Sequence, residues 1–354
     1  MSNRLEAYAH LTGQTLRTGF YAALYRFTNR RAARMSEGGV RIEISRPMPS
    51  IWSLLQDVLK LQAQDARNVR EGIYPAPIEE GGSLATRIEA MRRMIEDLPR
   101  SNERRLEKRA REVASLPQAQ GLPEYYTQNF HYQSGGYLTD ESAQLYDIQV
   151  ETLFMGSTGA MRRQAIPAIA EFVRGRDQRS LRLLDLACGT GRFLAQLAQA
   201  FPAMPLTGID LSQAYLAQAE RHLRDRRNIA LKQANAEALP FEAKSFDIVT
   251  CVYLFHELPH EVRRKVASEA ARVLKPGGLF ALIDSLQWGD VESYDGLLEA
   301  FPQRFHEPYY LDYLSDRIDG QKGLLAQSGL EPVQAFPAFL SKIAICRRME
   351  AKAY

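Results

Sequence analysis

A glycine-rich turn follows a short apolar run near the middle of the chain. Residues 183–191 read LLDLACGTG, and a helix is expected from Arg192 onward. Glycines let the backbone turn sharply and approach a bound ligand closely. A dinucleotide site would have a third glycine where Leu194 stands, and a carboxylate at Asp185 would repel a pyrophosphate. The same carboxylate attracts an ammonium group, so the turn favours a cofactor with a methionine moiety.

A second acidic residue ends the next predicted strand. The segment reads Gly208, Ile209, Asp210, Leu211. A carboxylate at this place can accept hydrogen bonds from both hydroxyls of a ribose, and Leu211 can then pack on an adenine ring. Together the two strand ends predict a site for a nucleoside that carries a methionine group.

These residues need a fold that brings the ends of several strands together. From residue 180 onward, short apolar runs alternate with amphipathic segments of helix length. Strands are predicted near Leu181–Leu186, Pro205–Ile209, Ile229–Gln233, Phe246–Val252 and Leu279–Ile283, and helices at Phe193–Ala200, Gln213–Leu223 and His260–Leu274. Strand and helix in alternation predict a parallel sheet covered on both faces, with ligands at the carboxyl ends of its strands.

The first third of the chain has a helical period instead. Amphipathic helices are predicted at Ile51–Leu61 and Leu84–Leu98, and a further helix through Met161–Phe172. We therefore divide the chain into a helical accessory domain (residues 1–122), a lid or linker segment (123–179) and a cofactor-binding domain (180–354). The first 36 residues hold six arginines and one glutamate. An ordinary surface helix and an element for a membrane surface or a partner both stay open there.

Five segments, in order, resemble the motif series of a known family. They are Asp185–Gly191, Asp210, Ala234–Phe241, Ser245–Val252 and Arg272–Gly278. The series resembles that of class I, Rossmann-like S-adenosylmethionine-dependent methyltransferases, and within them the group of quinone C-methyltransferases and small-molecule O-methyltransferases. The resemblance covers residues 180–347. It implies an α/β fold with a mostly parallel, seven-stranded sheet flanked by helices, here preceded by the helical accessory domain.

The resemblance implies S-adenosyl-L-methionine as the cofactor. In the family, an Asp commonly accepts a hydrogen bond from the adenine amino group. This chain has Asn235 at that position, and its amide oxygen can accept the same hydrogen bond. An aromatic residue of the preceding segment, Tyr132, is expected near the sulfonium. The residues expected to bind the cofactor are Asp185, Ala187, Cys188, Gly189, Gly191, Asp210, Leu211, Asn235, Ala236, Val252 and Tyr132.

A histidine and a glutamate follow the fourth predicted strand. Amino-methyltransferases of nucleic acids and proteins typically carry Asn-Pro-Pro-Tyr or Asp-Pro-Pro-Tyr here, and this chain does not. The segment from Tyr253 resembles instead the loop of phenolic O-methyltransferases, in which a His followed by an acidic residue supplies the base. It implies His256 as general base with Glu257 beside it, since an imidazole with a pKa near ~6.5 can take a proton at neutral pH. A histidine without a catalytic role is the alternative.

Two further segments are expected to form the substrate site, one before the first strand and one after the fifth. The residues expected to contact substrate are Tyr126, His131, Tyr137, Asp284, Gln287, His306, Glu307, Tyr309 and Tyr310. His131, His256, His306 and Glu307 have side chains that suit a metal ion. No sequential ligand spacing supports such a site, so no metal is expected.

Composition limits the partners. Charged residues make up 25% of the 354 residues and the net charge is +3, which does not call for a nucleic-acid partner. No run of about 18 apolar residues exists to span a membrane, and the three cysteines have no paired spacing. We expect a cytoplasmic protein with a small-molecule substrate; a homo-oligomer stays open.

The resulting functional prediction is methyl transfer from S-adenosylmethionine to a small molecule, in the first place to a hydroxyl oxygen with His256 as base. C-methylation of a small aromatic or quinone-like acceptor, and methylation of RNA or protein, are the alternatives within the enzyme class. Outside it, the chain would bind the cofactor as a scaffold without turnover.

Overall fold

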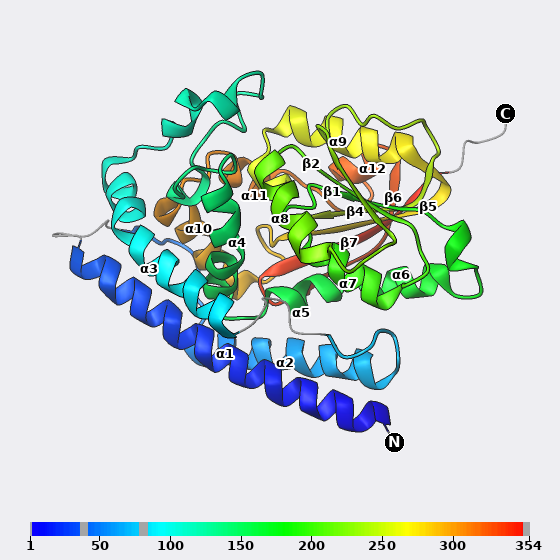
Figure 1. Ribbon diagram of the computed structural model, residues 1–354, viewed down its shortest axis with the longest axis horizontal. Helices are drawn as coiled ribbons and strands as arrows, with labels where there is room; N and C mark the ends of the chain where they lie inside the picture. Colours follow the sequence, from blue (N-terminus) through cyan, green and yellow to red (C-terminus); the bar gives the residue numbers. More distant parts are fainter. Residues whose placement is uncertain (1, 36–41, 78–83, 350–354) are drawn as a thin grey trace.

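A seven-stranded sheet forms the centre of the C-terminal half. The computed structural model describes residues 2–35, 42–77 and 84–349 (Figure 1). The strand order is β3-β2-β1-β4-β5-β7-β6, and only β7 runs antiparallel to its neighbours β5 and β6. The strands are β1 Leu183–Leu186, β2 Leu206–Asp210, β3 Ile229–Gln233, β4 Phe246–Val252, β5 Leu274–Ser285, β6 Leu330–Ala338 and β7 Ser341–Arg348. This confirms the predicted fold class.

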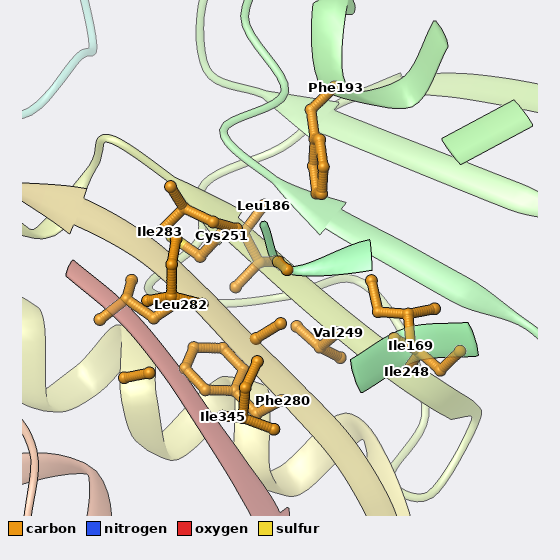
Figure 2. Close-up of a cluster of buried hydrophobic side chains, with 14 of the residues drawn as sticks. Ile169, Leu186, Phe193, Ile248, Val249, Cys251, Phe280, Leu282, Ile283 and Ile345 are labelled. Carbon is orange, nitrogen blue, oxygen red and sulfur yellow. The ribbon is translucent and has the colours of Figure 1, made fainter. Parts of the chain in front are cut away.

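The central strands are apolar on both faces because both faces are covered. Every residue of β1 is buried, as are the first six of β4. Figure 2 shows side chains from β4, such as Ile248 and Val249, packed beside Phe280 of β5, with Ile169 on one side of them. Parallel strands need this double cover, which is why they appear in the sequence as continuous apolar runs.

Helices cover the two faces of this sheet. They are α6 Ile166–Val173, α7 Arg192–Ala200, α8 Gln213–Leu223, α9 His260–Val273 and α12 Leu324–Gln327. The bounds of β3, β4 and α8 are those predicted. The predicted helix through Met161–Phe172 is instead two helices, α5 Thr158–Arg163 and α6, with a break before Pro167. Proline has no amide hydrogen to donate, and its ring clashes with the carbonyl one turn earlier, so the first helix ends at Arg163.

The N-terminal helices lie beside the sheet domain rather than apart from it. Helix α1 (Ser2–Met35) runs along α2 (Ile51–Arg70), α3 (Leu84–Glu107) and α4 (Asp140–Leu153) (Figure 1). The predicted helices at 51–61 and 84–98 both continue further than expected. No described helix is long and apolar enough to cross a membrane.

A buried polar network ties these helices to the sheet domain. Asp65 of α2 is fully buried and accepts from Arg163 of α5 at 2.9 and 2.6 Å. His10 of α1 lies 2.6 Å from the same carboxylate, and the hydroxyl of Tyr74 donates to it at 2.7 Å. The largest apolar cluster also joins Val58 and other side chains of these helices to the core of the sheet. The predicted domain boundaries at 122 and 179 stay a prediction.

The segment between β5 and β6 is partly helical. It contains α10 Asp295–Arg304 and α11 Tyr310–Ser315. Short 3-10 helices occur at Glu112–Ser115, Pro117–Ala119, Phe130–Tyr132, Gln178–Ser180, Phe255–Glu257 and Glu292–Tyr294. Two of these, 130–132 and 255–257, carry the predicted site histidines His131 and His256.

Candidate active site

A first cavity lies at the carboxyl ends of β1, β2 and β4. It has a volume of about 100 Å³. Predicted cofactor residues that line it are Ala187, Gly189, Asp210, Leu211, Asn235, Ala236 and Val252. Six tyrosines also line it: Tyr125, Tyr126, Tyr137, Tyr146, Tyr215 and Tyr253. The cavity thus has an acidic edge, an amide and an unusually aromatic wall.

The glycine-rich turn has the backbone geometry that its glycines permit. Gly189 and Gly191 have φ values of 55° and 79°. A Cβ on Gly189 would meet no atom within 4 Å, so this residue faces open space in the cavity. Its amide donates to Asp210 at 2.9 Å. At Gly191 a Cβ would come within 2.8 Å of Leu223, so that glycine is required by packing.

Two acidic residues lie at the turn, Asp210 on the wall of the first cavity and Asp185 behind the turn. Burial raises the pKa of Asp210 to about 6, although the amides of Ser212 and Gly189 donate to its carboxylate and favour the ionised form. Asp185 lies behind the turn, 1% exposed, and burial raises its pKa to about 7. Its Oδ1 accepts from Thr250 at 2.6 Å, but its Oδ2 has no hydrogen-bond partner among the described residues.

His256 is held by a buried carboxylate at the end of the neighbouring strand. Its Nδ1 lies 2.6 Å from Asp284, which is fully buried and also accepts from the amides of Phe255 and Ser285. Burial alone would lower the pKa of His256, but the Asp284 carboxylate outweighs it and raises that pKa to about 9. The bond to Nδ1 fixes the ring and leaves Nε2 for other groups, 3.8 Å from Glu257.

A histidine and two glutamates meet beside His256. Nε2 of His131 lies 3.2 Å from Glu307 and 3.9 Å from Glu257, and Tyr137 donates to Glu257 at 2.5 Å. Burial raises the pKa of both glutamates and lowers that of His131 to about 3. The ligand atoms of His131, Glu257 and Glu307 all lie within 4.8 Å of one another, close enough to hold a metal ion.

Strained backbone surrounds the same place. Ala187, His131, Tyr132 and Tyr253 are non-glycine residues with positive φ, between 51° and 57°. Each such conformation costs on the order of 1–3 kcal/mol and persists only where the surrounding structure enforces it. Such residues gather at functional sites, so their presence here supports a functional site near the glycine-rich turn and the cluster of His131, Glu257 and Glu307.

A second cavity, of about 300 Å³, begins at this cluster. His131, His256 and Glu257 lie on its wall, and it shares Tyr146, Tyr253 and Glu257 with the first cavity. The rest of the wall is mainly apolar and comes from α1, α2, α4 and α10, including Ala22, Leu54, Leu153, Phe154, Leu298, Phe301 and Phe305. The two cavities therefore meet at a polar, ionisable junction.

Comparisons with known proteins agree with this geometry. A family of methyltransferase domains matches residues 183–278. The demethylmenaquinone methyltransferase of Thermotoga maritima is 32% identical over 49% of this chain and 70% of its own length. The 27-O-demethylrifamycin SV methyltransferase of Amycolatopsis mediterranei is 33% identical over 60% of this chain and 71% of its own. This chain belongs to the S-adenosylmethionine-dependent methyltransferases.

Coverage of the relatives is uneven. A demethylmenaquinone methyltransferase of Lactococcus lactis is 39% identical, but the match spans 31% of this chain and 44% of that protein. The matched family segment, 183–278, contains the cofactor turn, Asp210 and His256 but none of the N-terminal helices. The family match therefore gives no information about the N-terminal helices of this methyltransferase.

Residues in and beside the first cavity have the chemistry to bind the cofactor of these methyltransferases. The Oδ2 atom of Asp185 is a buried acceptor without a donor, which a cofactor ammonium group would supply. The open space over Gly189 is where the backbone can approach a ligand. Arg162 is only 6% exposed, lies 5.6 Å from the Tyr253 ring centre and has no ion-pair partner among the described residues. Arg162 is therefore a candidate to form an ion pair with the carboxylate of the cofactor.

Several predicted residues lie outside the two cavities. Tyr132 packs against His306, with ring centres 5.7 Å apart, and not in the cofactor cavity. Cys188 is buried in the turn. Asp284 hydrogen-bonds to the ring of His256 and lines neither cavity. Gln287 donates to the carbonyl of Tyr313 and accepts from Lys342. His306 and Tyr309 both hydrogen-bond to Gln128.

Other predicted substrate residues do lie at the cavities. His131 and Tyr310 line the apolar cavity, and Tyr126 and Tyr137 line the cofactor cavity. Glu307 belongs to the cluster with His131 and Glu257.

The sequence reasoning missed much of both walls. Tyr146 and Tyr215 face the cofactor cavity from α4 and α8, and Ala22 and Leu54 face the apolar cavity from α1 and α2. The apolar stripe of residues 51–61 correctly predicts that α2 docks on something. Nothing in that stripe indicates that the partner surface includes a cavity.

Proposed function

We propose that this methyltransferase transfers a methyl group to a hydroxyl oxygen of a small, lipophilic acceptor, with His256 as the general base. The observation that carries the proposal is the position of His256. The residue lines the apolar cavity next to Glu257, which also lines the cofactor cavity. An acceptor in the apolar cavity can therefore present a polar group to His256 at the junction.

The cofactor cavity supplies the binding groups. Asp210 would accept from the ribose hydroxyls, Asn235 would accept from the adenine amino group, and Asp185 and Arg162 would face the two charged ends of the methionine group. When bound, S-adenosylmethionine supplies a methyl carbon activated by its sulfonium sulfur, which keeps the bonding electron pair. The tyrosine wall suits that cation because aromatic faces attract positive charge.

His256 would take the acceptor's proton on Nε2. Asp284 holds the ring through Nδ1, favours the tautomer with a free Nε2 and stabilises the imidazolium that forms. The raised pKa makes the neutral base the minor form at pH 7. It also brings the base close to the value of about 10 for a phenolic hydroxyl, so the proton can pass at little free-energy cost.

The acceptor class is supported by the cavity itself. A mainly apolar cavity of about 300 Å³ suits a small molecule better than a nucleic-acid strand. The names of the relatives indicate two kinds of methyl acceptor. The rifamycin enzyme is an O-methyltransferase by name, and the demethylmenaquinone enzymes act on a quinone. C-methylation of a quinone-like acceptor is therefore the second candidate, and the same base could ionise a hydroxyl of that acceptor if it binds in its reduced, quinol form.

The test combines product detection with variants. Incubation of the enzyme and methyl-deuterated S-adenosylmethionine with a lipid extract of its own cells should yield a labelled small molecule, and its NMR spectrum separates an O-methyl from a C-methyl product. His256→Gln should lower kcat by a factor of about 10² to 10⁴ with unchanged cofactor affinity. Asp284→Asn should act in the same direction, because the ring loses its orientation.

Controls separate the alternatives. Glu261→Gln, on an exposed side chain of α9, should leave turnover unchanged. Normal turnover of the His256 variant would exclude it as the base. Cofactor binding without any labelled product from lipid, RNA or protein fractions would favour a scaffold, and labelled RNA or protein would exclude a small-molecule acceptor.

A further inference from the structure

The junction between the two cavities carries more negative charge than the proposed chemistry uses. Glu257 and Glu307 come from the loop after β4 and the loop after α10, and His131 comes from the segment before α4. All three side chains are buried or largely buried, with exposed fractions of 13%, 0% and 23%. Two carboxyl groups this deep can both ionise only beside a positive partner, because burying an unpaired charge is costly.

Glu307 is the clearest sign that a partner is missing. Neither of its carboxylate oxygens has a hydrogen-bond partner among the described residues, although Oε1 lies 3.2 Å from Nε2 of His131. An N···O distance of 3.2 Å is within ion-pair range and also suits two atoms that bind one metal ion. Neighbouring ligands of one ion lie about 3 Å apart when each is bound at about 2.1 Å.

We propose that His131, Glu257 and Glu307 bind one divalent cation at this junction. One imidazole and two carboxylates form a mixed ligand set that suits Mn²⁺ or Zn²⁺. The three ligand atoms already lie within 4.8 Å of one another, so a small contraction brings them onto one ion. The hydroxyl of Tyr137, which donates to Glu257, would orient that ligand from outside.

This ligand set differs from the one considered from the sequence, which was His131, His256, His306 and Glu307. Nδ1 of His256 is bonded to Asp284, and Nε2 of His306 is bonded to the side chain of Gln128. The His306 ring is therefore engaged elsewhere, whereas His256 keeps Nε2 free but is not among the ligand atoms that lie within 4.8 Å of one another, and Glu257 takes their place. The strained backbone of His131, with φ 55°, directs its ring into the cluster instead.

The position suggests what the cation would do. His131 and Glu257 line the apolar cavity, so positions left open on the ion face the space assigned to the acceptor. A cation there would bind an acceptor oxygen, hold it at the junction and lower the pKa of its hydroxyl. Glu257 would then contribute to methyl transfer through the ion.

The test measures metal binding without cofactor or acceptor, so it does not depend on methyl transfer. The full-length protein is treated with chelator, dialysed and titrated with Mn²⁺, and unbound Mn²⁺ is followed by electron paramagnetic resonance. One saturable site per chain is expected. Glu307→Gln and His131→Gln should each weaken that site at least about tenfold.

Matched variants provide the controls. Glu261→Gln and His260→Gln remove a carboxylate and an imidazole outside the cluster, where the side chains are 81% and 41% exposed, and should leave Mn²⁺ affinity unchanged. Circular dichroism melts of the metal-free variants show whether each still folds. Absence of a saturable site in the wild-type protein, or equal affinity in a folded Glu307→Gln protein, would overturn the proposal.

Discussion

The carboxylates of the cofactor cavity are buried before a ligand arrives, so their ionisation should govern binding. Burial raises the pKa of Asp210 to about 6 and that of Asp185 to about 7. Hydroxyl and ammonium donors favour the ionised forms. We therefore expect cofactor affinity to rise with pH through this range, because each carboxylate must lose its proton on binding when the pH is below its pKa.

Calorimetry with S-adenosylhomocysteine between about pH 5 and pH 8 checks this expectation at the scale of single residues. Asp210→Asn should remove the part of the pH dependence centred near 6 and leave the part due to Asp185. Affinity that does not change with pH in the wild-type protein would contradict the assignment of both residues to cofactor binding.

At the scale of elements, the contact between α2 and α5 depends on one buried ion pair. Although burial alone would raise the pKa of Asp65, Arg163 and His10 lower it well below its usual range. The pair therefore stabilises the fold fully above about pH 4, and this stabilisation is lost as pH falls through the lowered pKa.

Asp65→Ala should lower the free energy of unfolding by about 3–5 kcal/mol, because it removes the buried carboxylate that accepts two hydrogen bonds from Arg163. Urea unfolding at neutral pH measures the change. Asp225→Ala, at a side chain that is 90% exposed, should stay within about 0.5 kcal/mol of the wild type. Similar losses in both variants would show that the ion pair contributes little.

At the scale of the whole molecule, the N-terminal helices form part of the wall of the apolar cavity. Ala22 of α1 and Leu54 of α2 line the same cavity as Leu298 and Phe301 of α10. The cavity that we propose for the acceptor therefore lies where the helical part and the sheet part meet, and the helices should help to define the acceptor.

Ala22→Phe places a ring in this cavity, whereas Ala23→Phe, one residue on, adds the same ring at an exposed position of α1. The first variant should weaken binding of an apolar fluorescent dye and raise KM for the acceptor about tenfold, with unchanged affinity for S-adenosylhomocysteine. The second should match the wild type in all three measurements. Equal dye binding by the two variants would remove α1 from the acceptor site.

The sequence alone determined the parts of this protein that depend on local patterns. The bounds of β3, β4 and α8 and the cofactor turn with Asp185 and Gly189 follow from periodicity, glycine placement and acidic strand ends. These signals lie within a few residues of one another, so no long-range contact is needed to detect them. The break before Pro167 was also detectable, because proline ends a helix for a local reason.

Tertiary structure decided what the site can do. Gln287 and Tyr309 have side chains that suit substrate contacts, yet packing engages both with the protein itself. His131, Glu257 and Glu307 come from three separate segments and meet only after the sheet, the lid segment and α10 have packed together. The sequence specifies which polar groups are present. Packing decides which of them find partners within the fold and which stay free for a ligand.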